Sequence, residues 1–310
     1  MIVESVGRGH PAIWSGAANP WIDLSTQRSD AGKVFGMSVE HQVGVLNGHA
    51  ALWSGTAQSL VDLHPSGTWY SQANATAGND QVGYAQLVIT GPLHAGLWHG
   101  SAQSFVDLNP PGAMSSSASS VVGGLQGGGA VFPTPQGSAA HAGLWTGSAH
   151  SFIDLHPGQE FVDSGITGMV EGQQVGAARR VTGNTHAALW RGTPQTYLDL
   201  APPNSGFSIL YGTCGSAQVG YANTLSLGIT AGIWFGTPES FVPLAPYLPA
   251  GYYESIATSV AEVNGTFYVG GYATNATSGS HDAFLWVGVP APASGLILGA
   301  GLVLRRHRRA

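Results

Sequence analysis

The sequence predicts an all-β protein with the architecture of a β-propeller, and three observations support this expectation. A phrase of small residue, aliphatic residue, Trp, any residue and Gly recurs seven times, at a mean spacing of about 45 residues. Gly (46) and Pro (18) are abundant while charged residues make up 8%, which is typical of a turn-dense, strand-rich chain. No stretch has a sustained 3.6-residue period, which excludes a helical solenoid. The tryptophans of the phrase are Trp14, Trp53, Trp98, Trp145, Trp190, Trp234 and Trp286.

Each repeat is expected to form four short strands. In the second repeat these are residues 49–53, which end at the repeated Trp, then 59–63, 69–76 and 81–85. In the first five repeats the Asp of an Asp-Leu pair stands nine residues after the Trp. A constant offset over a Gly-bearing loop predicts a hairpin of constant register.

The strand types set the expected number of blades. Seven Trp strands, seven Val-Gly strands and six of each other type give 26 strands, two fewer than seven four-stranded blades require. We therefore expect seven blades with one incomplete; six blades plus extra strands is the alternative. The first residues show no signal peptide, and the two missing strands would precede Met1. We therefore expect the natural chain to begin earlier than Met1. The glycines assigned to the Val-Gly strands are Gly7, Gly44, Gly83, Gly123, Gly176, Gly220 and Gly270.

Three short sequence phrases recur in order over residues 1–288. The first is Gln-Val-Gly, the second begins with His and Ala and ends with an aliphatic residue and Trp, and the third is Asp-Leu. They are clearest at Gln81–Tyr84, Gln174–Gly176 and His281–Trp286. In this respect the chain resembles the HAF extracellular repeat family. The resemblance implies an exported bacterial protein with a propeller-like fold over residues 1–288. The family lends no established biochemical activity.

Residues 289–310 form a different kind of segment. Pro290, Ala291 and Pro292 precede an apolar run, and an Arg-rich end follows it, which resembles a PEP-CTERM sorting tail with Ala291 where that family usually has Glu. The resemblance implies an exosortase-type sorting enzyme as a partner and a place at the cell surface. The 18 uncharged residues 287–304 are also long enough to span a bilayer, with the Arg cluster on the cytoplasmic side. A terminal strand with a solvated basic end is the alternative.

Five His residues stand four positions before a repeated Trp, and each of these repeats carries its Asp. In the sixth repeat both are replaced, by Thr230 and Pro243. Joint loss is expected if the two side chains form a hydrogen bond across adjacent strands, because removing one would leave the other without its partner. We interpret the pairs as structural and expect no metal site and no cofactor. The pairs are His10 with Asp23, His49 with Asp62, His94 with Asp107, His141 with Asp154 and His186 with Asp199.

The net charge of the chain and its aromatic residues indicate which functions to expect. Outside the Arg-rich end the chain is acidic, so nucleic-acid binding is not expected. Aromatic residues outside the Trp register are the candidates for ligand contact: Trp69, Tyr70, Tyr252 and Tyr253. No pair of carboxylates is marked as catalytic. We therefore expect a non-catalytic extracellular binding or scaffold protein, possible ligands being polysaccharide or matrix. An enzyme that acts on extracellular polysaccharide and a purely structural spacer are the alternatives.

Overall fold

The computed structural model describes residues 9–14, 21–291 and 295–304, with side chains described up to residue 288. Within these residues the chain forms strands and short 3-10 helices. It divides into two compact units, residues 1–156 with 163–166 and residues 157–162 with 167–310.

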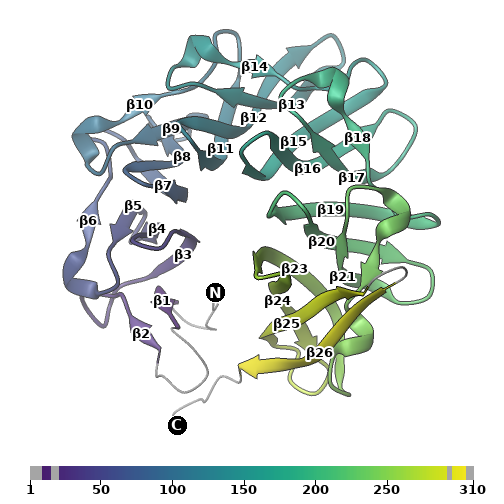
Figure 1. Ribbon diagram of the computed structural model, residues 1–310. Coiled ribbons are helices and arrows are strands. Elements are labelled where there is room, and N and C mark those ends of the chain that lie inside the picture. The colour runs from purple at the N-terminus through teal and green to yellow at the C-terminus, as the bar shows by residue number, and fades with distance from the viewer. Residues whose placement is uncertain (1–8, 15–20, 292–294, 305–310) are drawn as a thin grey trace. The chain divides into compact units, whose positions relative to one another are not determined.

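The strands of the first half of the chain form a two-stranded sheet and three four-stranded sheets (Figure 1). The two-stranded sheet consists of β1 (Ala12–Ile13) and β2 (Ile22–Asp23). The four-stranded sheets are β3 (Gly32–Met37), β4 (Gln42–Leu46), β5 (His49–Trp53) and β6 (Val61–Asp62); β7 (Tyr70–Ala77), β8 (Asp80–Gln86), β9 (Leu93–Trp98) and β10 (Val106–Asp107); and β11 (Ser115–Val122), β12 (Leu125–Thr134), β13 (Gly137–Trp145) and β14 (Ile153–Asp154).

The second half of the chain forms three more four-stranded sheets, the first of which begins with a strand that contributes to both units. They are β15 (Phe161–Val170), β16 (Gln173–Arg180), β17 (Thr185–Trp190) and β18 (Leu198–Asp199); β19 (Ser205–Thr213), β20 (Gln218–Thr224), β21 (Gly228–Trp234) and β22 (Val242–Pro243); and β23 (Tyr252–Val263), β24 (Thr266–Asn275), β25 (His281–Ala291) and β26 (Gly295–Leu304). The 3-10 helices are η1 (Ala57–Ser59), η2 (Ala102–Ser104), η3 (Ala149–Ser151), η4 (Pro194–Thr196), η5 (Pro238–Ser240) and η6 (Ala245–Tyr247).

Every four-stranded sheet has its strands in sequence order, as in the blades of a β-propeller. The expectation of an all-β propeller arrangement is confirmed, with six four-stranded blades and the separate sheet β1-β2. The constant hairpin register is confirmed as well, since Ala51 pairs with Asp62 and Gly96 with Asp107 at equivalent positions. Neighbouring blades pack through their first strands: β7 lies against β3, β4 and β5, and β23 lies against β19, β20 and β21.

The repeated tryptophans form the core between the blades. Six of the seven are fully buried, among them Trp53 and Trp234. The indole of Trp53 donates a hydrogen bond to the Leu24 carbonyl, and that of Trp234 donates to the Leu200 carbonyl. In both cases the acceptor is the Leu of the preceding Asp-Leu phrase, which is itself fully buried. The indole nitrogens of Trp98, Trp145, Trp190 and Trp286 are buried without a hydrogen-bond partner among the described residues, so the feature that these repeats share is the buried ring and not the polar contact.

The expected Val-Gly register needs correction in two blades. Gly83 pairs with Ala73, where a Cβ would lie 1.9 Å from the Gln72 carbonyl oxygen. In the third complete blade the equivalent position is Gly128, which pairs with Ala118. Gly123, the residue predicted for it, instead has a positive φ of 56° in the turn between β11 and β12. The glycine-rich run offered several equivalent alignments, and only the tight turn distinguishes them. In the last blade the equivalent glycine is Gly271, one residue after the predicted Gly270.

The last blade takes its fourth strand from the C-terminal segment. Strand β26 pairs antiparallel with β25, and Pro290 and Ala291 belong to β25 and pair with Leu296 and Gly295. Of the run 287–304 for which a membrane span was considered, residues 287–291 belong to β25 and residues 295–304 form β26. Pro292 and the Arg-rich end lie outside the described residues. No helix formed by the described part of the chain has the length and apolar character needed to cross a membrane.

Candidate binding site

The structure brings together all five His/Asp pairs that the sequence singled out. In each pair the His Nδ1 lies within hydrogen-bond distance of an Asp carboxylate oxygen on the neighbouring strand. The distances are 2.9 Å for His10–Asp23, 2.8 Å for His49–Asp62, 2.8 Å for His94–Asp107, 2.7 Å for His141–Asp154 and 2.8 Å for His186–Asp199.

The second carboxylate oxygen of each Asp caps the backbone that follows its strand. In the first pair the Ser25 N–H donates to Asp23 at 2.8 Å, and the same contact recurs two residues after each paired Asp. Burial raises the pKa of Asp23, but the hydrogen bonds from His10 and from Ser25 outweigh burial and lower the pKa. Each Asp thus joins two strands of its blade.

In two blades a second histidine stacks on the histidine of the His/Asp pair, and the sequence analysis did not predict this contact. The His64 ring stacks on the His49 ring at 3.9 Å, and the His156 ring stacks on the His141 ring at 4.0 Å. Burial lowers the pKa of His64, and the neighbouring His49 lowers it further. Both added histidines lie in an Asp-Leu-His-Pro sequence, which was the signal that could have revealed them. Among the described residues, no group of three or more His, Cys, Asp or Glu is arranged to hold a metal ion.

A buried serine extends this arrangement to the next blade, and the sequence analysis missed it as well. The Ala50 N–H, beside His49, donates to the Ser71 hydroxyl at 2.8 Å, and His64 Nδ1 lies 2.8 Å from the same hydroxyl. Ser71 is fully buried on β7. The backbone-to-serine contact recurs within each unit, at Ser116 and Ser164 in the first and at Ser208 and Ser255 in the second.

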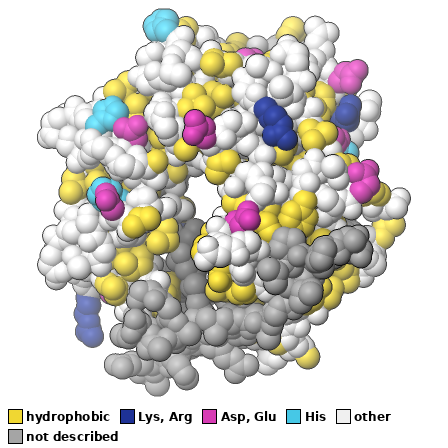
Figure 2. All heavy atoms as spheres, viewed as in Figure 1, with side chains coloured by type: hydrophobic (Ala, Val, Ile, Leu, Met, Phe, Trp, Pro, Cys, Tyr) yellow, Lys and Arg dark blue, Asp and Glu magenta, His cyan; other side chains and the backbone are white. Residues whose placement is uncertain are grey.

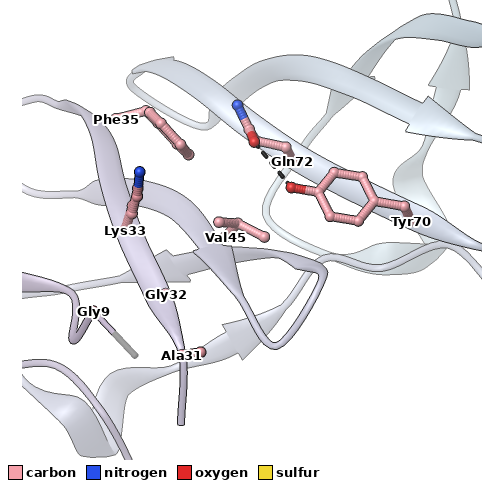
Figure 3. Close-up of a pocket in the computed structure, with 8 residues that line it drawn as sticks. All are labelled: Gly9, Ala31, Gly32, Lys33, Phe35, Val45, Tyr70 and Gln72. Atoms are coloured by element: carbon pink, nitrogen blue, oxygen red, sulfur yellow. Dashed lines mark hydrogen bonds between the residues drawn. The ribbon is translucent and has the colours of Figure 1, made fainter. Parts of the chain in front are cut away.

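One cavity in the first unit has the composition of a ligand site. It has a volume of about 310 Å³ and lies between strand β3 of one blade and strand β7 of the next (Figure 3). Its lining residues are Gly9, Ala31, Gly32, Lys33, Phe35, Val45, Tyr70 and Gln72.

The period of the two strands explains why these side chains share the cavity. Side chains alternate between the two faces of a strand, so Lys33 and Phe35 of β3 point to the same side. On β7, Tyr70 and Gln72 point to one side while Ser71 points to the buried side that contacts the preceding blade. The serine contact that fixes two blades therefore also directs the Tyr70 ring toward the cavity.

Tyr70 and Gln72, which line the cavity, are hydrogen-bonded to each other and to Tyr84 and Asn74, which do not line it. The hydroxyls of Tyr70 and Tyr84 both donate to Gln72 Oε1 at 3.1 Å, and Gln72 Nε2 donates to Asn74 Oδ1 at 2.7 Å. Burial raises the pKa of Tyr84 to about 12. Burial also raises the pKa of Tyr70, although the Lys33 charge opposes the rise. Both phenols are therefore neutral at physiological pH, and their rings stack on each other with centroids 6.0 Å apart.

The four predicted ligand-contact aromatics have separate surroundings. Tyr70 lines the cavity, and Trp69 is 61% exposed immediately before β7. Tyr252 and Tyr253 lie on β23 in the second unit, where the Tyr252 hydroxyl donates to Asp282 at 2.6 Å and Tyr253 is half-exposed. Of the four, only Tyr70 lines the described cavity.

Two carboxylates that do not belong to the repeated Asp-Leu phrase form local contacts. Glu160 forms an ion pair with Arg180 at 3.3 Å, and Asp163 accepts the Ala140 N–H at 3.0 Å. None of the eight residues that line the cavity is a carboxylate. Outside the grey residues, the face of the molecule shown in Figure 2 has no broad patch of a single charge.

Comparison with known proteins leaves the activity unassigned. No family model matches the chain, and no curated protein matches it. Solved structures do match. Prolyl oligopeptidase B from Galerina marginata is 11% identical with a TM-score of 0.48, over 85% of this chain and 36% of the other. The GH32 β-fructofuranosidase of Bombyx mori is 11% identical with a TM-score of 0.33, over 73% of this chain and 61% of the other. A candidate exo-β-1,3-galactanase from Bifidobacterium bifidum is 12% identical with a TM-score of 0.36, over 82% of this chain and 93% of the other.

The chain thus spans about a third of the length of the oligopeptidase. At these identities and TM-scores the matches assign no substrate and no catalytic residue to this chain.

Proposed function

We propose that this protein is a non-catalytic β-propeller that binds polysaccharide, with the cavity between β3 and β7 as the sugar site. The observation that supports it is the lining of the cavity. Tyr70 and Phe35 supply aromatic surface, and Gln72 supplies an amide beside them. Sugar rings combine apolar C–H faces with hydroxyl groups, so aromatic rings next to a few fixed polar groups suit them. The volume is at the lower end of the range of about 300–1,000 Å³ for ligand pockets, which fits one sugar residue.

The proposal includes the blade count. We assign β1-β2 to an incomplete seventh blade, because this sheet repeats the features of the complete blades. Ala12 pairs with Asp23 as Ala51 pairs with Asp62. The Trp53 indole donates to Leu24, just as Trp234 donates to the Leu of its preceding repeat.

The proposal also places the protein at the cell surface, held by its C-terminal segment and presented to an exosortase-type enzyme. The support is the sequence resemblance of residues 289–310 to a sorting tail. Fractionation of cells that express the full chain tests this part. Deletion of residues 289–310 should release the protein from the membrane fraction, and retention there would contradict the anchoring role.

A glycan array tests the binding function. Wild-type protein should bind a subset of oligosaccharides, and Tyr70→Ala should lose that binding because it removes an aromatic wall of the cavity. Tyr268→Ala is the matched control, since it removes an exposed tyrosine from strand β24 of the second unit. No binding on a broad array would refute the proposal. Release of shortened sugars from a bound polysaccharide would instead establish the enzymatic alternative.

A further inference from the structure

The Ser71 hydroxyl joins the blade β7–β10 to the preceding blade, and it has a histidine as its second partner. It accepts the Ala50 N–H at 2.8 Å and lies 2.8 Å from His64 Nδ1. The other ring nitrogen, His64 Nε2, lies 3.2 Å from the Thr68 carbonyl oxygen, which can only accept a hydrogen bond. The ring proton is therefore on Nε2, and Nδ1 accepts the proton of the Ser71 hydroxyl. The contact between the two blades is thus complete only while His64 is neutral.

The next blade boundary of the same unit has the same serine with a partner that does not titrate. Ser116 of β11 accepts the Ala95 N–H at 2.9 Å and donates its hydroxyl proton to Asn109 Oδ1 at 2.7 Å. Asn109 stands two residues after the paired Asp of its blade, as His64 does in the preceding blade. The chain therefore uses an amide and an imidazole for one structural role, and only the imidazole can gain a charge.

Two titratable groups face His64, and both belong to the blade β3–β6. The His49 ring on β5 stacks on His64 with the ring centroids 3.9 Å apart, and the Asp62 carboxylate on β6 lies 2.8 Å from His49 Nδ1. Across the boundary, β7 has one titratable residue, Tyr70, whose hydroxyl donates to Gln72. In the described part of the chain, none of the hydrogen bonds of His64 is to a carboxylate. A positive charge on His64 would therefore meet a second imidazole and no directly bonded anion.

We propose that the His64–Ser71 contact is an acid-sensitive link between the blades β3–β6 and β7–β10, which opens when His64 takes a second proton from solvent. The added proton occupies Nδ1, so the Ser71 hydroxyl loses its acceptor, and the new charge lies against the His49 ring. The hydroxyl then no longer holds the Ala50 N–H in its present position. Tyr70 precedes Ser71 and lines the cavity, so the cavity wall loosens together with the link. The link is independent of the ligand that the cavity takes.

The direction of the pH effect follows from the pKa of His64. The unfolded chain binds a proton there near the ordinary pKa of 6.5, whereas burial and the neighbouring His49 lower the pKa in the folded protein. The stability that the neutral ring supplies is therefore fully present above the unfolded-state value and is lost as the pH falls through the folded-state value. The link should accordingly weaken on acidification.

Hydrogen exchange of single amides, followed by NMR on the full chain between about pH 8 and about pH 5, tests the link. The protection factor of the Ala50 amide should fall several-fold over this range. The Ala95 amide is the internal control and should keep its protection factor, because its serine has Asn109 as the second partner. The nitrogen spectrum of the His64 ring should show the proton on Nε2 alone at the upper end of the range.

Two reciprocal variants assign the effect to one side chain. His64→Asn copies the arrangement at Asn109, and should keep the protection of the Ala50 amide while removing its pH dependence. Asn109→His should give the Ala95 amide a pH dependence that it lacks in the wild-type protein. At that boundary His94 is the equivalent histidine of a His/Asp pair, so the setting of the new imidazole matches the original one.

Three results would overturn the proposal. The first is an Ala50 protection factor that follows that of Ala95 down to about pH 5, and the second is a loss in acid that persists in His64→Asn. The third is a neutral His64 ring with its proton on Nδ1, because the Ser71 hydroxyl would then have no acceptor to lose. Should His64→Asn fail to fold, Asn109→His decides, since an Ala95 amide that stays insensitive to pH in this variant would equally contradict the link.

Discussion

At the scale of single residues, the glycine of each Val-Gly strand is required by close backbone approach. A Cβ on Gly83 would lie 1.9 Å from the Gln72 carbonyl oxygen and 2.9 Å from the Ala73 Cα, both of which are backbone atoms. Gly83→Ala is therefore expected to destabilise the protein by about 1–3 kcal/mol or more. Denaturant unfolding measures the change. Gly165→Ala is the matched control, because a Cβ there would meet no atom within 4 Å, and an equal loss in both variants would contradict the account.

Asp30 is a buried carboxylate whose charge stabilises a turn. It accepts hydrogen bonds from Thr26, Gln27 and Asn47 at 2.8–2.9 Å. The Asn47 side chain in particular lowers the pKa of Asp30 below its ordinary value of 3.8. A lowered folded-state pKa adds stability that is fully present above the unfolded-state value and is lost as the pH falls through the folded-state value.

Asp30→Asn is consequently expected to lose about 1–3 kcal/mol at neutral pH, and the difference from wild type should shrink as the pH falls below about 4. Urea unfolding at a series of pH values measures this difference. Glu40→Gln, a change in an exposed loop, should leave the curve unaltered. A deficit of Asp30→Asn that stays constant down to the acid limit would show that the charge is not the stabilising feature.

At the scale of elements, the His/Asp pairs are expected to couple the last two strands of the first four complete blades. His94 and Asp107 lie 2.8 Å apart and are both partly exposed, so a coupling free energy of about 0.5–1.5 kcal/mol is expected from a double-mutant cycle of alanine variants. The cycle of His94 with Asp154, whose partner is His141, is the control and should give a value near zero. A coupling of His94 with Asp107 that equals the control would remove the structural role.

The C-terminal strand is the element with two interpretations, and truncation distinguishes them. Removing residues 295–310 takes away the partner of β25 and leaves its backbone groups at an open edge. We expect a lower midpoint of thermal unfolding and concentration-dependent association, measured by calorimetry and size-exclusion chromatography. A truncated protein with unchanged stability would mean that the segment is dispensable for the fold.

At the scale of the whole molecule, the repeat pattern predicted the propeller and its hairpins because each blade uses the same local spacing. The five His/Asp pairs were predictable for the same reason, since their partners are always 13 residues apart. The prediction that Gly123 is the glycine of the Val-Gly strand was wrong. A run of glycines has no side chains that would indicate which glycine pairs with the neighbouring strand. The buried serines were missed because each bonds a backbone N–H of another blade, and such an acceptor leaves no pattern within a single repeat.

The cavity could be predicted only in part. Tyr70 stood out as an aromatic residue outside the Trp register, but its partner Lys33 belongs to the preceding blade and lies outside every repeated phrase. Their meeting depends on how β7 packs against β3, which involves the serine contact and the close approach at the Val-Gly glycines. Features that arise between repeats are therefore visible in the structure and hidden in the sequence.

The most direct test of the account is a crystal structure of the full chain with the tightest-binding oligosaccharide. We expect one sugar ring in the cavity between β3 and β7, against Tyr70 and Phe35. A sugar bound at another surface, with this cavity empty, would contradict the assignment of the site.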